Sequence, residues 1–367
     1  MTTAAGVHVW DRFQQALKRY APEADGSQIR KLEIAKSGAL LAQLRDGSRP
    51  LWLSWDRERI SELHPAADAQ IPLSGLLRER GEDPTLEILN YRPEKRLVVL
   101  DRGRVEPRVI KGYRSGRAAP AFERYEAARK ACRGDDIRAP EVLELVESSE
   151  SLVMAFEPGR PLDLSSGAVD VFYGIGVGLA NFQRRGSEIE ADNFSSADEL
   201  KVIDRFVDKV AAAGLELPPG WEALRERLEA AVPTLPESSH GLCHRDLYDK
   251  QFTFNGHSLT LLDFDLMCRA DVALDPANFL AHMALRQFQG VNGASATGIA
   301  MCGAQLLEGL GRNDEAGFWE RLRFYQASSF CRLALVYTLR PCWAALVPLL
   351  VRMGERSLDD LRRIQGG

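Results

Sequence analysis

The chain has 367 residues, of which 45% are apolar and 27% charged, and its formal net charge is −5. This length accommodates two or three packed units, and the composition is ordinary for a globular protein. The acidic balance argues against nucleic acid as the main partner, because no basic stripe is available to neutralise phosphates.

The chain shows no targeting or membrane signal. The N-terminal sequence MTTAAGVHVWDRF lacks the charged segment and apolar run of a secretory signal, so we expect a cytoplasmic protein. The most apolar late segment, 330–351, is interrupted by Arg332 and Arg340. It falls short of the about 18 uninterrupted apolar residues of a membrane span, and we expect a pair of buried helices there.

The six cysteines are scattered and form no CxxC pair, which is typical of reduced thiols in the cytosol. The cluster of His240, Cys243 and His244 has no second ligand pair at the spacing of a zinc site. We therefore do not expect a metal there.

The segment 1–84 is predicted to be an α+β extension. It contains an amphipathic helix over 9–20, strands within 29–44 and 49–55 around the turn RDGS, and a loop over 64–75.

From Thr85 the pattern predicts a strand-rich lobe followed by a helical one. Three strand-like runs lead into a helix over 120–133 and a strand over 151–156. The strand-like runs cover 85–89, 96–100 and 107–113, and the later helices are expected over 169–185, 197–213, 220–230, 276–289, 296–310 and 315–338. The fold class is thus α+β with two lobes, 85–157 and 158–367, and a ligand cleft between them.

The clearest exception to the helical pattern is HRDLYDKQFTFNGHSLTLLDFD, residues 244–265. Its alternation around Asn-Gly predicts a β-hairpin with a loop at 255–258, Phe254 opposite Leu259 and Phe252 opposite Leu261. In that register Gln251 enters the hairpin beside the point where Asp263 leaves it.

The polar residues of this segment suit phosphoryl transfer. The oxygen atoms of Gln251 and Asp263 are suitable ligands for Mg²⁺, and Asp246 precedes them on a loop where it would act as a base. A base beside metal ligands is what phosphoryl transfer requires. An aspartate in a turn is usually only a cap, but the three residues together favour the functional interpretation.

The motifs HRDLYDKQ and LLDFD resemble the HxDxxxxN and IDxD signatures of the aminoglycoside phosphotransferase and choline kinase-like family, which has the protein-kinase-like fold. The resemblance covers residues 85–290 and implies a small-molecule kinase. It implies Asp246 as catalytic base, Gln251 and Asp263 as metal ligands, and Asp265 as the second acid of the metal motif. His244 and the adjacent Arg245 would be structural.

Two further features accompany this resemblance. The family has asparagine where this chain has Gln251, which keeps the carbonyl donor but adds a methylene group. The segment ALDPANFLAH resembles the part of the family that follows the metal site. There Asp275 would be a helix N-cap and Pro276 the first helical residue, so we interpret Asp275 as scaffold.

A kinase-like cleft also requires a strand lysine paired with a helix glutamate. Strand alternation places Val109, Lys111 and Tyr113 on one face. Val109 would then cover the adenine, and Lys111 would reach the phosphates. We expect Lys111 to pair with Glu126 rather than with Glu123, because Glu126 stands on the appropriate face of the helix.

By the resemblance alone, the backbone groups of Ala155 and Glu157 in the connection between the lobes would meet the adenine. Lys95 and Arg96, in a turn without glycine, are expected to be solvated rather than bound to phosphate. The run GIGVGLA (174–180) looks like a dinucleotide fingerprint, but it follows no strand, so we expect close helix packing instead.

The sequence therefore predicts an ATP- or GTP-dependent O-phosphotransferase that uses Mg²⁺ and a small-molecule hydroxyl acceptor. A nucleotide-binding regulator without turnover is the alternative that Gln251 leaves open. A protein kinase is disfavoured, because only twelve residues separate Asp263 from Asp275 and leave little room for an activation segment. The sequence indicates neither the acceptor nor the oligomeric state.

Overall fold

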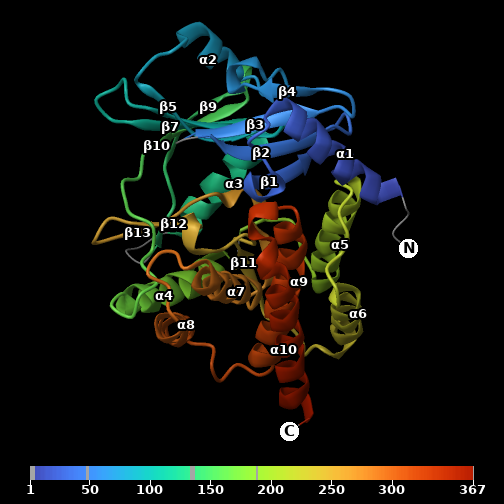
Figure 1. The fold of residues 1–367 in the computed structure, drawn as a ribbon. Helices are drawn as coiled ribbons and strands as arrows, with labels where there is room; N and C mark the ends of the chain where they lie inside the picture. The colour runs from blue at the N-terminus through green and yellow to red at the C-terminus, as the bar shows by residue number, and fades with distance from the viewer. Residues whose placement is uncertain (1–4, 47–48, 133–136, 187–188, 367) are drawn as a thin grey trace.

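The protein is described by a computed structural model that covers residues 5–46, 49–132, 137–186 and 189–366. Most of its strands lie in the upper part of Figure 1 and most of its helices in the lower part. This confirms the expected fold class, a β-rich N-terminal region followed by a mainly helical C-terminal region.

The N-terminal segment forms a four-stranded antiparallel sheet covered by one helix. The helix α1 (Ala5–Tyr20) turns Phe13 and Leu17 into the core, and Phe13 packs on the Trp55 ring at 5.7 Å. The sheet has the order β1 (Ile29–Ile34), β2 (Leu40–Asp46), β3 (Arg49–Trp55), β4 (Ile60–Leu63). Two residues of the expected RDGS turn, 47–48, lie outside the described residues.

A second, five-stranded antiparallel sheet follows, with α2 (Ser74–Arg80) between the two in sequence. Its order is β5 (Leu86–Arg92), β6 (Arg96–Asp101), β7 (Arg108–Tyr113), β10 (Ser151–Ala155), β9 (Val142–Val146). The sheets are joined by apolar packing and by the Trp52 indole, which donates to the Tyr91 carbonyl oxygen at 3.0 Å. The helix α3 (Ala118–Ala131) buries Ala121, Tyr125 and Ala128 toward the site described below.

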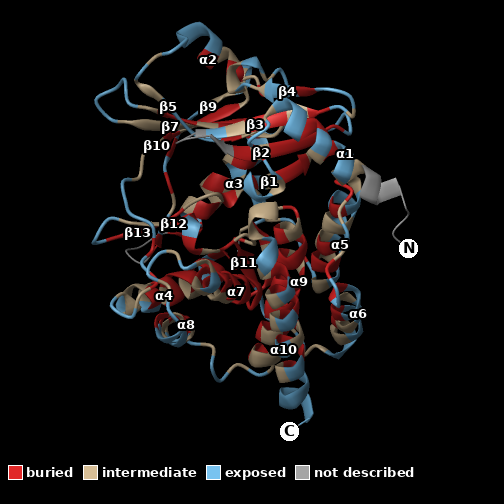
Figure 2. Ribbon diagram, in the orientation of Figure 1, coloured by how far each residue is buried: buried red, intermediate tan, exposed pale blue. Residues whose placement is uncertain are grey.

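The C-terminal region is built from seven helices and two small sheets among the residues described. The helices are α4 (Val169–Arg185), α5 (Ser196–Ala212), α6 (Trp221–Ala231), α7 (Leu274–Gln289), α8 (Ala296–Leu310), α9 (Phe318–Thr338) and α10 (Val347–Gly366). Helix α9 is the central one and is buried along most of its length, as Figure 2 shows.

The apolar segment 330–351 forms the end of α9, a 3₁₀ turn and the start of α10, as expected of a helix pair, although α10 runs on to Gly366. No helix in the described part of the chain is long and apolar enough to span a membrane.

The glycines of GIGVGLA lie within α4, where Gly176 allows a close approach to α8 and Gly178 a close approach to Ile137. A Cβ atom at Gly176 would stand 2.2 Å from the Leu306 carbonyl oxygen. The expectation of close helix packing is therefore confirmed.

The two small sheets hold the segment that carries the predicted chemistry. One pairs β11 (His240–Cys243) with β14 (Cys268–Asp271), and the other pairs the hairpin β12 (Phe252–Phe254) and β13 (Leu259–Leu261) with β8 (Ile137–Arg138). Phe252 lies opposite Leu261 and Phe254 opposite Leu259, so the predicted hairpin register is confirmed. Strand β8 lies within the expected N-terminal lobe, 85–157, but pairs with β13 of the expected C-terminal lobe. The division of the chain at residues 84 and 157 therefore remains a prediction.

Candidate active site

The loop from His244 to Gln251 is fixed at its start by a buried carboxylate. Asp275 accepts hydrogen bonds from the backbone N–H groups of His244 and Arg245, both at 2.7 Å, and its side chain is fully buried. Arg245 has a φ of 70°, a left-handed conformation that a non-glycine residue rarely adopts. Its guanidinium group lies over the Phe194 ring at 3.9 Å.

The N-cap expected at Asp275 and the helix start expected at Pro276 are both wrong, because α7 begins two residues before Pro276, at Leu274, with Ala273 as its cap. The Asp275 carboxylate instead accepts hydrogen bonds from a loop that is distant in sequence, at His244 and Arg245. Burial raises the pKa of Asp275, and its two backbone donors stabilise the charged form in return.

We expect Asp275→Ala to lower the free energy of unfolding by about 2–5 kcal/mol, because two buried N–H groups lose their acceptor. Urea denaturation of both proteins measures this difference. The exposed Asp314 provides a matched Asp→Ala control, for which a change within about 0.5 kcal/mol is expected. Equal losses in the two variants would contradict a scaffolding role for Asp275.

His244 ties this loop to the end of the hairpin. Its Nε2 atom lies 2.7 Å from the Leu262 carbonyl oxygen, and its ring packs on Phe264 with centroids 5.4 Å apart. Since a carbonyl oxygen only accepts, Nε2 must carry the hydrogen. The arrangement matches the structural role expected of His244.

Asp263 and Asp265 form the centre of the site, where two cations lie between them. Lys111 Nζ is 2.9 Å from Asp263 Oδ1 and 2.7 Å from Asp265 Oδ1. Arg96 Nη1 is 3.0 Å from Asp263 Oδ2 and 2.8 Å from Asp265 Oδ2. Asp263 has the left-handed backbone angles φ 62° and ψ 65°, a conformation of the kind that clusters at functional sites.

The charges of this cluster stabilise one another. Burial alone would raise the pKa of Asp263, but Lys111 and Arg96 hold it well below its usual value. Burial would likewise lower the pKa of Lys111, and Asp263 raises it well above the ordinary value. Both groups are therefore charged at neutral pH, in a cluster that stretches from β6 and β7 to the end of the hairpin.

The ion pair expected between Lys111 and Glu126 is not formed. Glu126 lies 3.4 Å from Arg129 on its own helix, whereas Lys111 donates to the Tyr125 hydroxyl at 3.2 Å. Helix α3 is thus rotated so that Tyr125, not the residue after it, faces the strand lysine. The shared face of the strand is as predicted, since Tyr113 also reaches Asp265 at 3.0 Å.

The expectation that Lys95 and Arg96 are solvated is wrong for Arg96, whereas Lys95 remains 38% exposed although it has an ion-pair partner. Arg96 enters the aspartate cluster, and Lys95 forms an ion pair with the buried Glu33 of β1. Arg92 also contacts Glu33, at 3.1 Å. The turn between β5 and β6 therefore reaches the C-terminal lobe on one side and the N-terminal sheet on the other.

Asp246 and Gln251 lie together beside this cluster. The side-chain Nε2 of Gln251 is 3.5 Å from Asp246 Oδ2. The backbone carbonyl oxygen of Gln251 accepts a hydrogen bond from the backbone N–H of Leu262 at 2.7 Å. Burial raises the pKa of Asp246, and the nearby Asp263 adds to this effect. The hairpin thus brings Gln251 next to the segment that carries Asp263, as its register predicted.

One of the backbone groups expected to meet the adenine in the connection between the lobes is already hydrogen-bonded within the protein. The Ala155 N–H already donates to the Glu141 carbonyl oxygen at 2.9 Å. Glu157 lies 3.5 Å from the Thr260 hydroxyl through its carboxylate. Val109, on the strand that pairs with β10, is partly buried against the core.

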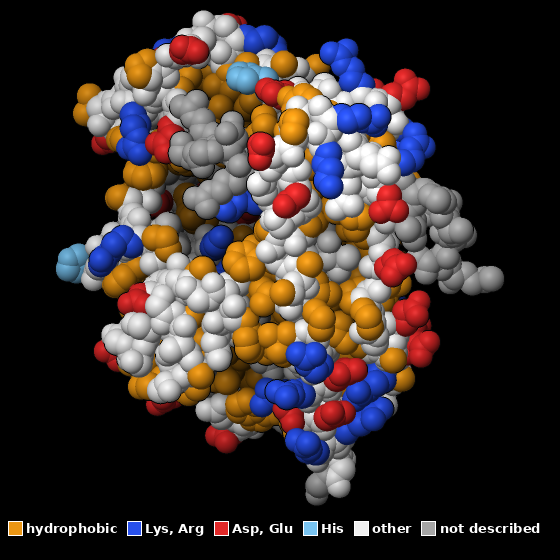
Figure 3. Space-filling model, in the orientation of Figure 1, with side chains coloured by type: hydrophobic (Ala, Val, Ile, Leu, Met, Phe, Trp, Pro, Cys, Tyr) orange, Lys and Arg blue, Asp and Glu red, His pale blue; other side chains and the backbone are white. Residues whose placement is uncertain are grey.

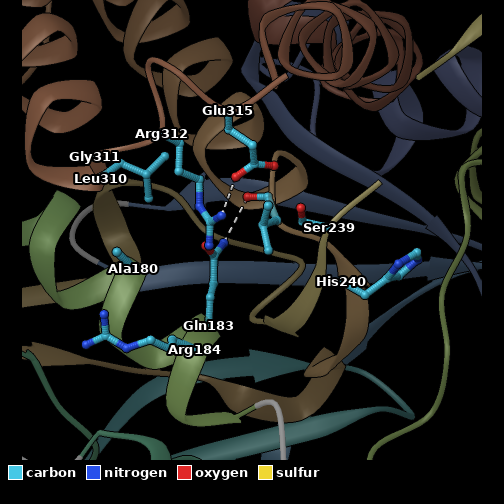
Figure 4. A pocket seen from close by; sticks show the side chains of 10 residues that line it. Ala180, Gln183, Arg184, Ser239, His240, Leu310, Gly311, Arg312 and Glu315 are labelled. Atoms are coloured by element: carbon cyan, nitrogen blue, oxygen red, sulfur yellow. Dashed lines mark hydrogen bonds and ion pairs between the residues drawn. The ribbon is translucent and has the colours of Figure 1, made fainter. Parts of the chain in front are cut away.

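Figure 3 shows a hollow between the two lobes in which Lys and Arg side chains are visible. A separate cavity of about 480 Å³ lies at the far end of β11 and includes His240, Arg312 and Glu315. Figure 4 shows that polar groups of this cavity are paired with one another; Arg312 lies 2.5 Å from Glu315 and 3.4 Å from the Gln183 amide. None of the residues predicted for the site lines this cavity.

The aspartate cluster contains two acids and one nearby amide. No group of three His, Cys, Asp or Glu side chains arranged as a ready-made metal site is found in the described ranges.

Comparisons with known proteins agree with this fold. Three similar solved structures are an amicoumacin kinase in complex with AMP-PNP, Ca²⁺ and Ami, a choline/ethanolamine kinase family protein from Mesorhizobium loti, and the choline kinase LicA from Streptococcus pneumoniae. Their identities are 13%, 16% and 12%, and their TM-scores 0.57, 0.53 and 0.53. The matches cover 81%, 82% and 78% of this chain and 96%, 100% and 98% of the other chains.

No curated protein matches the sequence significantly. The model of the phosphotransferase enzyme family matches residues 90–325, more than half of the chain. The matched region contains both sides of the aspartate cluster, from Arg96 and Lys111 to Asp263 and Asp265. The chain therefore belongs to the phosphotransferase enzyme family and has the kinase-like fold of small-molecule phosphotransferases.

Proposed function

We propose that the protein is a nucleotide-dependent O-phosphotransferase that transfers the γ-phosphate of ATP or GTP to a hydroxyl group of a small molecule. The observation that carries this proposal is the convergence of Lys111, Arg96, Asp263 and Asp265 beside Asp246. Two carboxylates held with two cations next to a third acid provide the charges that a triphosphate, a metal ion and an acceptor hydroxyl require.

The residues of the cluster fit a divalent cation. Asp263 and Asp265 both offer oxygen ligands, which hard cations such as Mg²⁺ prefer. Their carboxylates already converge on shared cations, since Lys111 Nζ and the Arg96 guanidinium each contact both acids. Gln251, Asp263 and Asp265 would hold Mg²⁺, and the bound ion would neutralise charge on the β- and γ-phosphates.

The roles of the other residues follow from this arrangement. Lys111 and Arg96 are positioned to bind phosphate oxygens when the aspartates receive a metal ion. Asp246 would accept the proton of the acceptor hydroxyl as its oxygen bonds to phosphorus. The bond between the γ-phosphorus and the bridging oxygen then breaks, which leaves a nucleoside diphosphate and a phosphate ester. The raised pKa of Asp246 favours a base that takes up a proton readily.

The first test is whether nucleotide binding depends on a divalent cation. We expect calorimetric titration with AMP-PNP to give tighter binding in Mg²⁺ than in EDTA, and we expect slow Mg²⁺-dependent hydrolysis of ATP or GTP when water replaces the acceptor. Binding without any turnover, even with hydroxylated metabolites present, would favour the nucleotide-binding regulator. Failure to bind either nucleotide would contradict the proposal.

A further inference from the structure

A buried histidine without polar partners stands next to the catalytic loop. His282, on α7, is 9% exposed, and neither of its ring nitrogens has a hydrogen-bond partner among the described residues. Its ring stacks on Tyr248 with centroids 4.7 Å apart, and Tyr248 follows Asp246 by two residues. A buried imidazole in this position leaves one donor and one acceptor unsatisfied, which is rare for a buried polar side chain.

The surroundings of His282 are strongly cationic. Burial lowers the pKa of His282 well below its usual value, and the charges of Arg286, Arg332 and Arg340 lower it further. Arg286 belongs to the same helix, whereas Arg332 and Arg340 come from α9 and its end. The imidazole is therefore neutral, and its single N–H is available as a donor.

Only part of this positive charge is balanced by acids. Arg286 Nε lies 2.9 Å from Asp249, and Arg332 Nε lies 3.3 Å from Glu199. Arg340 forms no ion pair with any residue that the structure describes; its guanidinium lies over the Tyr337 ring at 4.9 Å.

Arg340 stands where the helical lobe meets the N-terminal sheet. The residue before it, Leu339, accepts a hydrogen bond from Leu32 of β1 at 2.7 Å. On the sheet side Lys31, Arg92 and Lys95 surround the single carboxylate of Glu33. Burial and the charge of Arg92 lower the pKa of Lys31 to about 8. Positive charge is thus in excess on both sides of this junction.

We propose that the acceptor is an anionic alcohol, a small molecule that carries a carboxylate or phosphate group in addition to its hydroxyl. Arg340 and the His282 N–H would bind the anionic group, with Arg332 contributing charge, so that the hydroxyl meets Asp246. This inference rests on the proposed phosphotransferase function and names its substrate class. A quaternary or primary ammonium group in the same place would be repelled by Arg340, which forms no ion pair among the described residues, and this repulsion disfavours its binding.

The excess charge serves the acceptor rather than the nucleotide because the two sets of cations are separate. Lys111 and Arg96 stand at the aspartate cluster on the side of β6 and β7. The second set is linked through contacts of α7 instead. His282 stacks on Tyr248, which also lies under the Arg286 guanidinium at 5.9 Å. Arg340 lies over Tyr337, whose hydroxyl accepts a hydrogen bond from Gln289 of α7 at 2.9 Å. A nucleotide bound at the aspartates therefore leaves the second set available.

A matched set of sugars tests the inference, with the protein first saturated with Mg²⁺ and AMP-PNP. Glucose is neutral, glucosamine cationic, gluconate a carboxylate and glucose 6-phosphate a phosphate ester. We expect titration calorimetry to detect binding of gluconate, glucose 6-phosphate or both, and weaker or no binding of the other two. The two anions distinguish a carboxylate site from a phosphate site.

Reversal of the charge at Arg340 provides a second test of the inference. Arg340→Glu is expected to weaken anion binding about 30-fold or more. Arg352→Glu, which makes the same change at an exposed position of α10, should leave anion binding unaltered. Arg340→Gln replaces the reversal if Arg340→Glu does not fold, as judged by circular dichroism.

Three results would overturn the inference. They are equal or tighter binding of glucose or glucosamine, anion binding that is insensitive to Arg340, and no saturable anion binding up to about 10 mM, a concentration that corresponds to a negligible affinity. Failure of AMP-PNP to bind in the first step would instead count against the phosphotransferase function, so the two failures are distinguishable.

Discussion

Replacement of Asp246 by asparagine is expected to reduce phosphoryl transfer about 10²–10⁴-fold, the usual contribution of a general base, while nucleotide affinity changes little. Asparagine keeps the size of the side chain and an oxygen that can accept from Gln251 Nε2, which lies 3.5 Å from Asp246 Oδ2. The variant thus removes the proton acceptor and leaves the loop in place. In the proposed binding mode the nucleotide would be bound by other residues, chiefly Lys111 and Arg96.

The measurement is single-turnover transfer from labelled nucleotide, together with calorimetric affinity for AMP-PNP. Asp314→Asn, at an exposed position, is the matched control and should retain the wild-type rate. If Asp246→Asn transfers phosphate as fast as the wild type, Asp246 has no role as base. If its nucleotide affinity falls in parallel with the rate, the aspartate acts on binding instead.

The hairpin was predictable because its information is local. The alternation of apolar and polar residues around Asn255 and Gly256 admits one register that places the large side chains together. That register brings Gln251 next to Asp263, whatever the rest of the fold does. The structure shows the predicted pairs, Phe252 with Leu261 and Phe254 with Leu259.

The partner of Lys111 was not predictable from the same kind of pattern. Strand alternation places Lys111 on the correct face, but which residue of α3 faces it depends on the rotation of that helix about its axis. One residue corresponds to about 100° of rotation in a helix with 3.6 residues per turn. The packing of Tyr125 on Phe264, with ring centroids 5.5 Å apart, accompanies a rotation that turns Tyr125 toward Lys111.

Arg96 was missed because its partners are distant in sequence. A turn without glycine gives no sign that it will reach Asp263, which lies 167 residues later. The same holds for His282 and Arg340, which become neighbours only when α7 and the end of α9 pack together. When the partner of a charged residue lies in another lobe, the sequence predicts a solvated side chain, because the contact exists only in the folded arrangement of the lobes.

Substitution of Asp263 by alanine is expected to abolish the support that Mg²⁺ gives to nucleotide binding. Asp263 provides one of the two carboxylates on which Lys111 and Arg96 converge, at 2.9 and 3.0 Å. With Asp265 alone, the remaining carboxylate is shared by two cations and is a poor ligand for a hard metal ion. Calorimetric titration with AMP-PNP at increasing Mg²⁺ concentration measures the effect, and a wild-type dependence on Mg²⁺ would contradict the metal assignment.

The same variant should behave differently when the metal is removed. In EDTA the wild-type carboxylates compete with nucleotide phosphates for Lys111 and Arg96, because all four groups are held together in the protein without ligand. Loss of Asp263 frees part of this positive charge, so metal-free affinity for AMP-PNP should equal or exceed that of the wild type. A general loss of structure would instead weaken binding under both conditions, so the opposite responses with and without Mg²⁺ separate a lost metal ligand from a misfolded site.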